Sequence, residues 1–175
     1  AVHLSSVHVD LGMQCVDCHS AQDGHGDGYI KNEVMAGVEI MCQDCHGTAD
    51  EYPQLKTTGP AAPPTGRLLS LIRNPDGKKR FEWIDGKLIQ RSATTPGLEW
   101  EMTLLKDVSS STSSGYNVAA DRAHTMSRNT ETLAFGADVP LADRAHGEDK
   151  MLCYTCHSSW TTSCGGCHLP IEANW

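Results

Sequence analysis

The sequence predicts a chain that is mostly irregular with short helices at its two ends, plus a small inserted antiparallel β-meander. Three observations lead to this fold class. All eight cysteines lie towards the ends of the 175-residue chain, and aromatic residues make up only 6% of it. The middle contains turn-forming stretches between short apolar segments. Because so few aromatic side chains cannot fill an ordinary core, we expect the two ends to be organised around an additional apolar group.

The motif C-x-x-C-H occurs four times and uses every cysteine. Two copies, CVDCH and CQDCH, lie in residues 1–50, and two more, CYTCH and CGGCH, lie in residues 146–168. Two thiols at this spacing can add to the two vinyl groups of one porphyrin, and the histidine that follows can bind its iron. Zinc sites and redox dithiols also use paired cysteines, but neither requires the adjacent histidine. The motifs therefore predict four covalently attached haem c groups, which form the core of both ends.

The residues that attach these groups follow from the motif itself. The cysteines predicted to bind the porphyrins are Cys15, Cys18, Cys42, Cys45, Cys153, Cys156, Cys164 and Cys167. The histidines predicted to be the proximal iron ligands are His19, His46, His157 and His168. We find no further constellation of catalytic residues.

Five other histidines are candidates for the second axial position of the irons. His8 and His146 each stand seven residues before the first cysteine of a motif, and His124 shares the sequence ADRAH with His146. His25 lies in a glycine-rich stretch and His3 near the chain end, and these two are also candidates for donation to a neighbouring chain. Five candidates for four irons allow bis-histidine, low-spin coordination throughout, which favours electron transfer over catalysis.

The part of the chain without these motifs predicts a different architecture. The stretch GPAAPPTG (59–66) has the composition of a linker. Beyond it, NPDG and DG are turn signals that separate apolar segments. We expect antiparallel strands at residues 68–73, 80–84 and 87–91, with a fourth at 98–105. The chain is thereby divided into an N-terminal di-haem unit (1–50), a haem-free β-rich insertion (51–115) and a C-terminal di-haem unit with an upstream distal-histidine segment (116–175).

Charge and hydropathy limit the binding partners and the cellular locations that the sequence allows. The formal net charge of −8 argues against nucleic acid as a partner. No apolar run is long enough to form a transmembrane segment. Haem is attached to C-x-x-C-H motifs on the outer side of the cytoplasmic membrane in bacteria and archaea. We therefore expect the protein to be extracellular or periplasmic.

The stretches HVDLGMQCVDCH and CHSSWTTSCGGCHLP resemble segments of the large multihaem c-type cytochromes of anaerobic respirers and metal reducers. The number of motifs and the chain length also resemble the tetrahaem subunits of extracellular cytochrome filaments. The resemblance covers roughly residues 1–50 and 116–175. It implies a link in a respiratory or extracellular electron conduit, with redox proteins as partners and a homopolymer whose haem stacks join between subunits.

Two other functions are compatible with the sequence. One is a multihaem reductase that acts on a small nitrogen or sulfur compound at one open haem. Some enzymes of that kind replace the motif histidine with lysine, and no C-x-x-C-K occurs in this chain. The other is an electron-entry module of a larger multihaem cytochrome. We expect an electron carrier rather than an enzyme.

Overall fold

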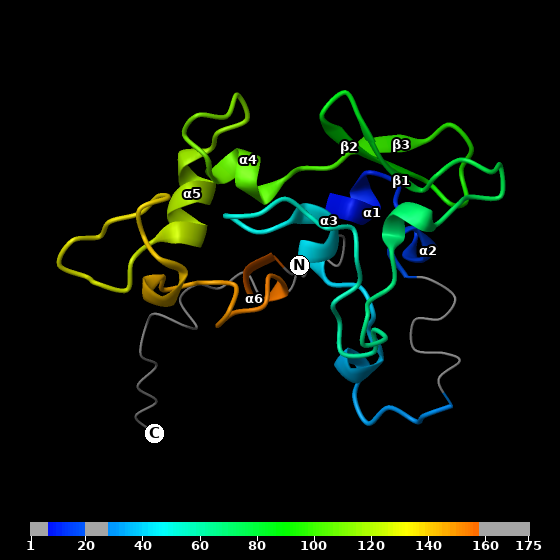
Figure 1. Cartoon of the computed structure of the whole chain (residues 1–175), viewed down its shortest axis with the longest axis horizontal. Coiled ribbons are helices and arrows are strands. Elements are labelled where there is room, and N and C mark those ends of the chain that lie inside the picture. The colour runs from blue at the N-terminus through cyan, green and yellow to red at the C-terminus, as the bar shows by residue number, and fades with distance from the viewer. Residues whose placement is uncertain (1–6, 20–27, 158–175) are drawn as a thin grey trace, which may run out of the picture.

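The protein is described by a computed structural model that covers residues 7–19 and 28–157 (Figure 1). A three-stranded antiparallel sheet with the order β1-β2-β3 lies at one end of the long axis. Its strands are β1 (Phe81–Ile84), β2 (Lys87–Arg91) and β3 (Glu99–Glu101). The first two lie within one residue of their predicted positions. The third covers only three residues of the expected strand at 98–105.

The turn between β1 and β2 explains why these strands pair as a tight hairpin. Asp85 and Gly86 both have positive φ angles, 49° and 80°, as a two-residue type I′ turn requires. Glycine adopts this conformation without steric cost, and aspartate tolerates it better than most residues. The resulting register places Phe81 opposite Gln90, and both side chains are buried.

Residues 68–73 do not form the predicted strand. They contain instead a 3₁₀ turn, η2 (Leu69–Leu71). Leu69 is buried in the core, and Ile72, three positions later, packs against the same core. Residues three apart face the same side of a 3₁₀ turn but opposite sides of a strand. The spacing of the two buried side chains therefore favours the turn.

The remaining elements are short helices and 3₁₀ turns. The α-helices are α1 (Val7–Asp10), α2 (Cys15–Cys18), α3 (Cys42–His46), α4 (Leu105–Ser109), α5 (Val118–Thr125) and α6 (Tyr154–His157). The other 3₁₀ turns are η1 (Val34–Gly37) and η3 (Leu141–Asp143). In the part of the chain that the structure describes, no helix has the length and apolar character needed to cross a membrane.

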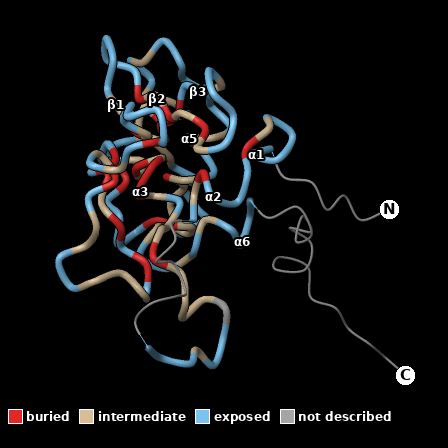
Figure 2. Tube along the Cα trace, turned by 90° about the vertical axis from the view of Figure 1, so that its right-hand side faces the viewer, coloured by how far each residue is buried: buried red, intermediate tan, exposed pale blue. Residues whose placement is uncertain are grey.

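The main apolar core lies beneath the sheet and includes one of the motif cysteines. Its buried members are Cys45, Leu55, Leu69, Phe81, Leu88, Met102 and Leu104. Figure 2 shows buried stretches in the sheet and in α3. The second C-x-x-C-H motif and the region predicted to be haem-free therefore share one core. The division of the chain into three units remains a prediction.

The Pro/Gly stretch 59–66 is packed against its neighbours. The N–H of Gly59 donates to the carbonyl oxygen of Glu39 (2.8 Å), and that of Ala61 donates to Val38 (3.0 Å). A Cβ atom at Gly59 would lie 2.4 Å from the Val38 carbonyl oxygen. Glycine is needed here because the two backbones approach so closely. The stretch thus holds the segment before α3 in place.

Candidate haem sites

Three of the four motifs lie within the described residues, and each includes a short helix. The first is in α2, the second in α3 and the third at α6. Side chains three positions apart lie on one face of a helix, so this conformation suits two cysteines that bind one group. The six cysteines concerned are all free thiols. The predicted site residues that lie outside the described residues are Cys164, Cys167, His168, His3 and His25.

An aspartate inside the motif caps each of the first two helices. The N–H of Gln14 donates to the Asp17 carboxylate (2.7 Å), and the N–H of Met41 donates to that of Asp44 (2.8 Å). Each carboxylate satisfies a backbone donor at the start of the helix that carries the cysteines. Both aspartates are almost fully buried. Sequence reasoning treated these positions as spacers, although the shared pattern C-x-D-C-H was visible.

The same aspartates tie the motifs to the middle of the chain. Asp17 accepts a hydrogen bond from the N–H of Ala93 (2.6 Å), and the Gln90 side chain donates to the Asp17 carbonyl oxygen (2.6 Å). Asp44 accepts from both the N–H and the hydroxyl of Thr58 (3.0 and 2.7 Å). Burial raises the pKa of the Asp44 carboxyl, and its hydrogen bonds oppose this rise. The middle of the chain therefore positions both N-terminal motifs.

Replacement of Asp44 by alanine is expected to lower the free energy of unfolding by about 2 kcal/mol, because a helix cap and two further hydrogen bonds are lost. Urea unfolding measures the change. Asp76→Ala is the matched control, since this exposed carboxylate also accepts a backbone N–H, from Lys78 (3.0 Å). We expect a loss of at most about 0.5 kcal/mol there. Equal losses in the two variants would contradict the special role of Asp44.

The structure brings two of the candidate distal histidines close to motif histidines. The His8 ring lies 5.9 Å from the His46 ring, centroid to centroid, with a 48° angle between their planes. The His124 and His157 rings are also 5.9 Å apart and nearly parallel, at 7°. An iron bonded at about 2 Å to one nitrogen of each ring would separate the centroids by roughly 6 Å. The separation of the rings in both pairs is therefore compatible with two axial ligands of one haem iron.

Backbone carbonyl groups orient two of the histidine rings. Nδ1 of His46 donates to the carbonyl oxygen of Thr103 (2.7 Å), and Nδ1 of His146 approaches that of Ala123 (3.3 Å). A carbonyl oxygen can only accept, so Nδ1 carries the proton and Nε2 keeps its lone pair. A metal-binding histidine usually donates its other ring N–H to an oxygen in this way. Thr103 lies just after β3, in the region that carries no motif.

The surroundings of the two distal candidates in these pairs lower their pKa values and so favour the neutral form. Burial lowers the pKa of His8, and the neighbouring His46 lowers it further. Burial is also the main cause that lowers the pKa of His124. The neighbouring His157 and His146 lower this pKa further, whereas Glu148 raises it. Neutral imidazole is the form that binds a metal. Both rings are therefore in the state that coordination requires.

The first cysteines of the second and third motifs meet in space. The thiol of Cys153 donates a hydrogen bond to the sulfur of Cys42, which lowers the pKa of Cys42 to about 7 and raises that of Cys153. Cys18 of the first motif lies close to the second motif, because Cys42 contributes to the raised pKa of Cys18 and Cys18 contributes to the raised pKa of Cys45; burial is the main cause in both. The second motif thus lies between the first and the third.

An ion pair between buried Arg144 and exposed Asp50 joins the second motif region to the segment around His146. Arg144, which is 2% exposed, donates to both carboxylate oxygens of Asp50 at 2.7 Å. Its Nε also donates to the carbonyl oxygen of Val139 (3.0 Å). Nearby, the N–H of Ala49 donates to the side chain of Glu148 (3.1 Å). Sequence reasoning did not anticipate this link, because nothing in the ADRAH repeat shows which of its two arginines is buried.

The two ADRAH segments lie against each other. The N–H of Ala145 donates to the carbonyl oxygen of Met126 (2.8 Å), and Ser127 and Arg144 form an antiparallel bridge. His124 lies on α5, whereas His146 follows η3, so the same five residues have different local structures. Their contact gathers His124 and His146 near the third motif.

Within residues 7–19 and 28–157, no three His, Cys, Asp or Glu side chains are arranged as ligands of a single metal ion. A structural zinc site needs four ligands, whereas a haem iron needs only the two axial histidines from the protein.

No protein-family profile, curated protein or solved structure matches this chain.

Proposed function

We propose that this protein transfers electrons through four covalently attached c-type haems. The observation that carries the proposal is the pairing of His46 with His8 and of His157 with His124. In each pair one ring belongs to a C-x-x-C-H motif and the other comes from a distant part of the chain. A bound haem supplies an iron that cycles between its ferric and ferrous states.

The protein's own contribution is to close and orient the site. A histidine on each face leaves no position for a substrate on the iron, which favours an electron carrier over a catalyst. The hydrogen bond from His46 to Thr103 fixes the ring that follows the second motif. The caps at Asp17 and Asp44 fix the helices that hold the cysteines. Rigidly held ligands would limit the structural change around a haem iron when it gains or loses an electron.

The contact between motifs supports transfer along the chain. Cys42 and Cys153 share a hydrogen bond, so haems attached to the second and third motifs would have neighbouring attachment points. Cys18 brings the first motif close to the second. These contacts favour the order first, second, third for neighbouring centres. We propose that the protein acts in this way as a link in a respiratory or extracellular electron conduit.

The test is the mass of the denatured protein, which we expect to exceed the mass of the polypeptide by four haems. Thioether bonds should retain the haems through acid–acetone extraction, whereas haem held only by its axial ligands is lost. Metal analysis is expected to give about four iron atoms per chain. A protein that contains zinc and little iron would contradict the proposal.

An optical spectrum distinguishes the carrier from the reductase alternative. Bis-histidine irons are low-spin in the ferric protein and do not bind carbon monoxide rapidly in the ferrous protein. The reductase requires at least one open iron and therefore a high-spin component. Binding of one carbon monoxide per haem in the unmodified protein would contradict a closed carrier.

A further inference from the structure

Two cysteines that belong to different motifs lie in direct contact, although one is near each end of the chain. The thiol of Cys153 donates a hydrogen bond to the sulfur of Cys42. Cys42 is exposed and Cys153 is partly exposed, so a reagent in solution reaches both. Two thiols in contact need only a small approach to form a disulfide, whose S–S bond is about 2 Å long. The contact is therefore a place where the chain can be cross-linked.

Interactions outside the motifs hold these two cysteines together. Asp50, which follows the second motif, accepts two hydrogen bonds of 2.7 Å from Arg144, which precedes the third motif. The N–H of Ala49 donates to the side chain of Glu148 (3.1 Å). These contacts lie a few residues from each cysteine and do not involve sulfur. The approach of the two thiols is therefore part of the fold.

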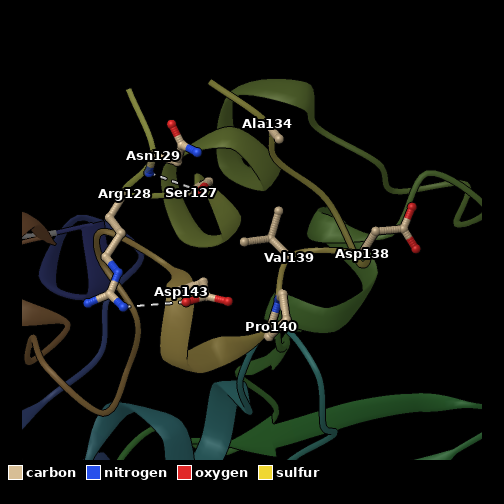
Figure 3. Close-up of a pocket in the computed structure, with 8 residues that line it drawn as sticks. All are labelled: Ser127, Arg128, Asn129, Ala134, Asp138, Val139, Pro140 and Asp143. Carbon is tan, nitrogen blue, oxygen red and sulfur yellow. Dashed lines mark hydrogen bonds and ion pairs between the residues drawn. The ribbon is translucent and has the colours of Figure 1, made fainter. Parts of the chain in front are cut away.

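The segment that carries Arg144 is also fixed on its other side. The N–H of Arg128 donates to the carbonyl oxygen of Asp143 (2.9 Å), and the N–H of Ala145 donates to that of Met126 (2.8 Å). Figure 3 shows the side chains of Arg128 and Asp143 meeting at the edge of an open hollow that both residues line. Because the segment is held on two sides, it presents the third motif to the second in a defined position.

The alternative partner of Cys42 inside its own motif is less accessible. Cys45 is buried in the main apolar core, only 8% exposed, so an oxidant in solution does not reach its sulfur. The hydrogen bond from Cys153 lowers the pKa of Cys42 to about 7, which increases its share of thiolate near neutral pH. The thiolate is the form that attacks a disulfide. Exposure and reactivity therefore favour a bond between motifs over one within the second motif.

We propose that Cys42 and Cys153 form a disulfide in chains whose second and third motifs carry no haem. The Cys42 thiolate attacks the disulfide of a small or protein oxidant and releases one thiol, and the Cys153 sulfur then displaces the other. The two cysteines lose two electrons and two protons, which convert the oxidant disulfide into two thiols. A dithiol reductant reverses the reaction by the same exchange.

The disulfide itself does not depend on the proposed function, but its consequence rests on it. A sulfur held in a disulfide cannot form a thioether with a vinyl group of a porphyrin, so one bond would block two motifs at once. Attachment of haem at either motif removes one sulfur of the pair and so prevents the bond. The pair acts in this way as a redox switch that decides whether the two motifs accept haem.

The full-length chain, produced without haem attachment, provides the first test. One equivalent of oxidised glutathione is added, the remaining thiols are blocked with N-ethylmaleimide, and the chain is cut with trypsin without reduction. We expect a disulfide that joins residues 32–56 to residues 151–175 and lowers the mass of the two peptides by about 2 Da. Cys153→Ser should abolish this product. Cys156→Ser, which removes the other cysteine of the same motif, should leave it unchanged.

A disulfide between Cys42 and Cys45, or a mixture of pairings, would overturn the proposal. The second test is the haem content of the full-length protein, measured by mass, when the cellular dithiol reductant is limiting. We expect the haems of the second and third motifs to be lost together. Cys42→Ser should restore the haem of the third motif. Cys45→Ser, which damages the second motif equally but keeps the contact, should not restore it.

The two tests separate this inference from the proposed function. A protein that carries four haems, but whose haem-free chain does not form the disulfide, would overturn the inference alone. A protein that carries no haem and forms the disulfide would contradict the proposed function alone. Independent loss of the haems of the second and third motifs would overturn the switch.

Discussion

Replacement of His124 by alanine is expected to convert one haem from low-spin to high-spin and to let about one carbon monoxide bind per chain. The His124 and His157 rings are nearly parallel, with centroids 5.9 Å apart, a separation that two axial ligands of one iron would also have. Alanine cannot coordinate iron, whereas the proximal histidine and both cysteines of the third motif remain. The haem should therefore stay attached with one face open. Ferric optical spectra and carbon monoxide titration of the ferrous protein measure the change.

The control for this experiment is Arg122→Ala, which alters an exposed residue of the same helix without removing a candidate ligand. We expect its spectrum to match that of the unmodified protein. His8→Ala should open a different haem, that of the second motif, because His8 faces His46. A His124→Ala protein that remains fully low-spin and binds no carbon monoxide would show that this assignment is wrong.

Replacement of Arg144 by alanine is expected to lower the free energy of unfolding by about 2 kcal/mol. The guanidinium group is buried and makes three hydrogen bonds, two to Asp50 and one to the Val139 carbonyl oxygen. Its removal leaves a cavity and an unsatisfied backbone acceptor. It also breaks the link between the segment after the second motif and the segment before the third. Urea unfolding followed by far-UV circular dichroism measures the loss.

Arg128→Ala provides a matched control, because it removes an arginine from the same region and also breaks an aspartate pair. The side chains of Arg128 and Asp143 are 66% and 54% exposed, and their pair is 3.4 Å long. Exposed pairs contribute little, so we expect a change of at most about 0.5 kcal/mol. Similar losses for the two arginines would mean that burial of Arg144 has no special importance for stability.

The hairpin could be predicted from the sequence because its information is local. The dipeptide Asp85-Gly86 determines the turn, and apolar segments on both sides determine the strands. The strand predicted at residues 68–73 is wrong because turn signals mark where an apolar segment ends but not its backbone conformation. The spacing of Leu69 and Ile72 was visible in the sequence. The sequence does not show, however, that both side chains pack on the same core.

The sequence predicts which residues belong to the candidate sites, but not which distal histidine meets which motif. The motif identifies the cysteines and the histidines that follow them, because the proposed covalent attachment requires this spacing. Which distal histidine meets which motif depends on contacts between distant segments. His8 precedes the first motif by seven residues, yet its ring faces His46 of the second motif. No local pattern contains that information.

The order of the paired histidines along the chain has a consequence for how the protein matures. His8 precedes His46, and His124 precedes His157, so each second ligand is synthesised before the motif that it faces. Each haem proposed for these two motifs would therefore be attached to a chain in which its covering ligand is already present. A partly made chain would not expose reactive iron at these two centres while it waits for later segments.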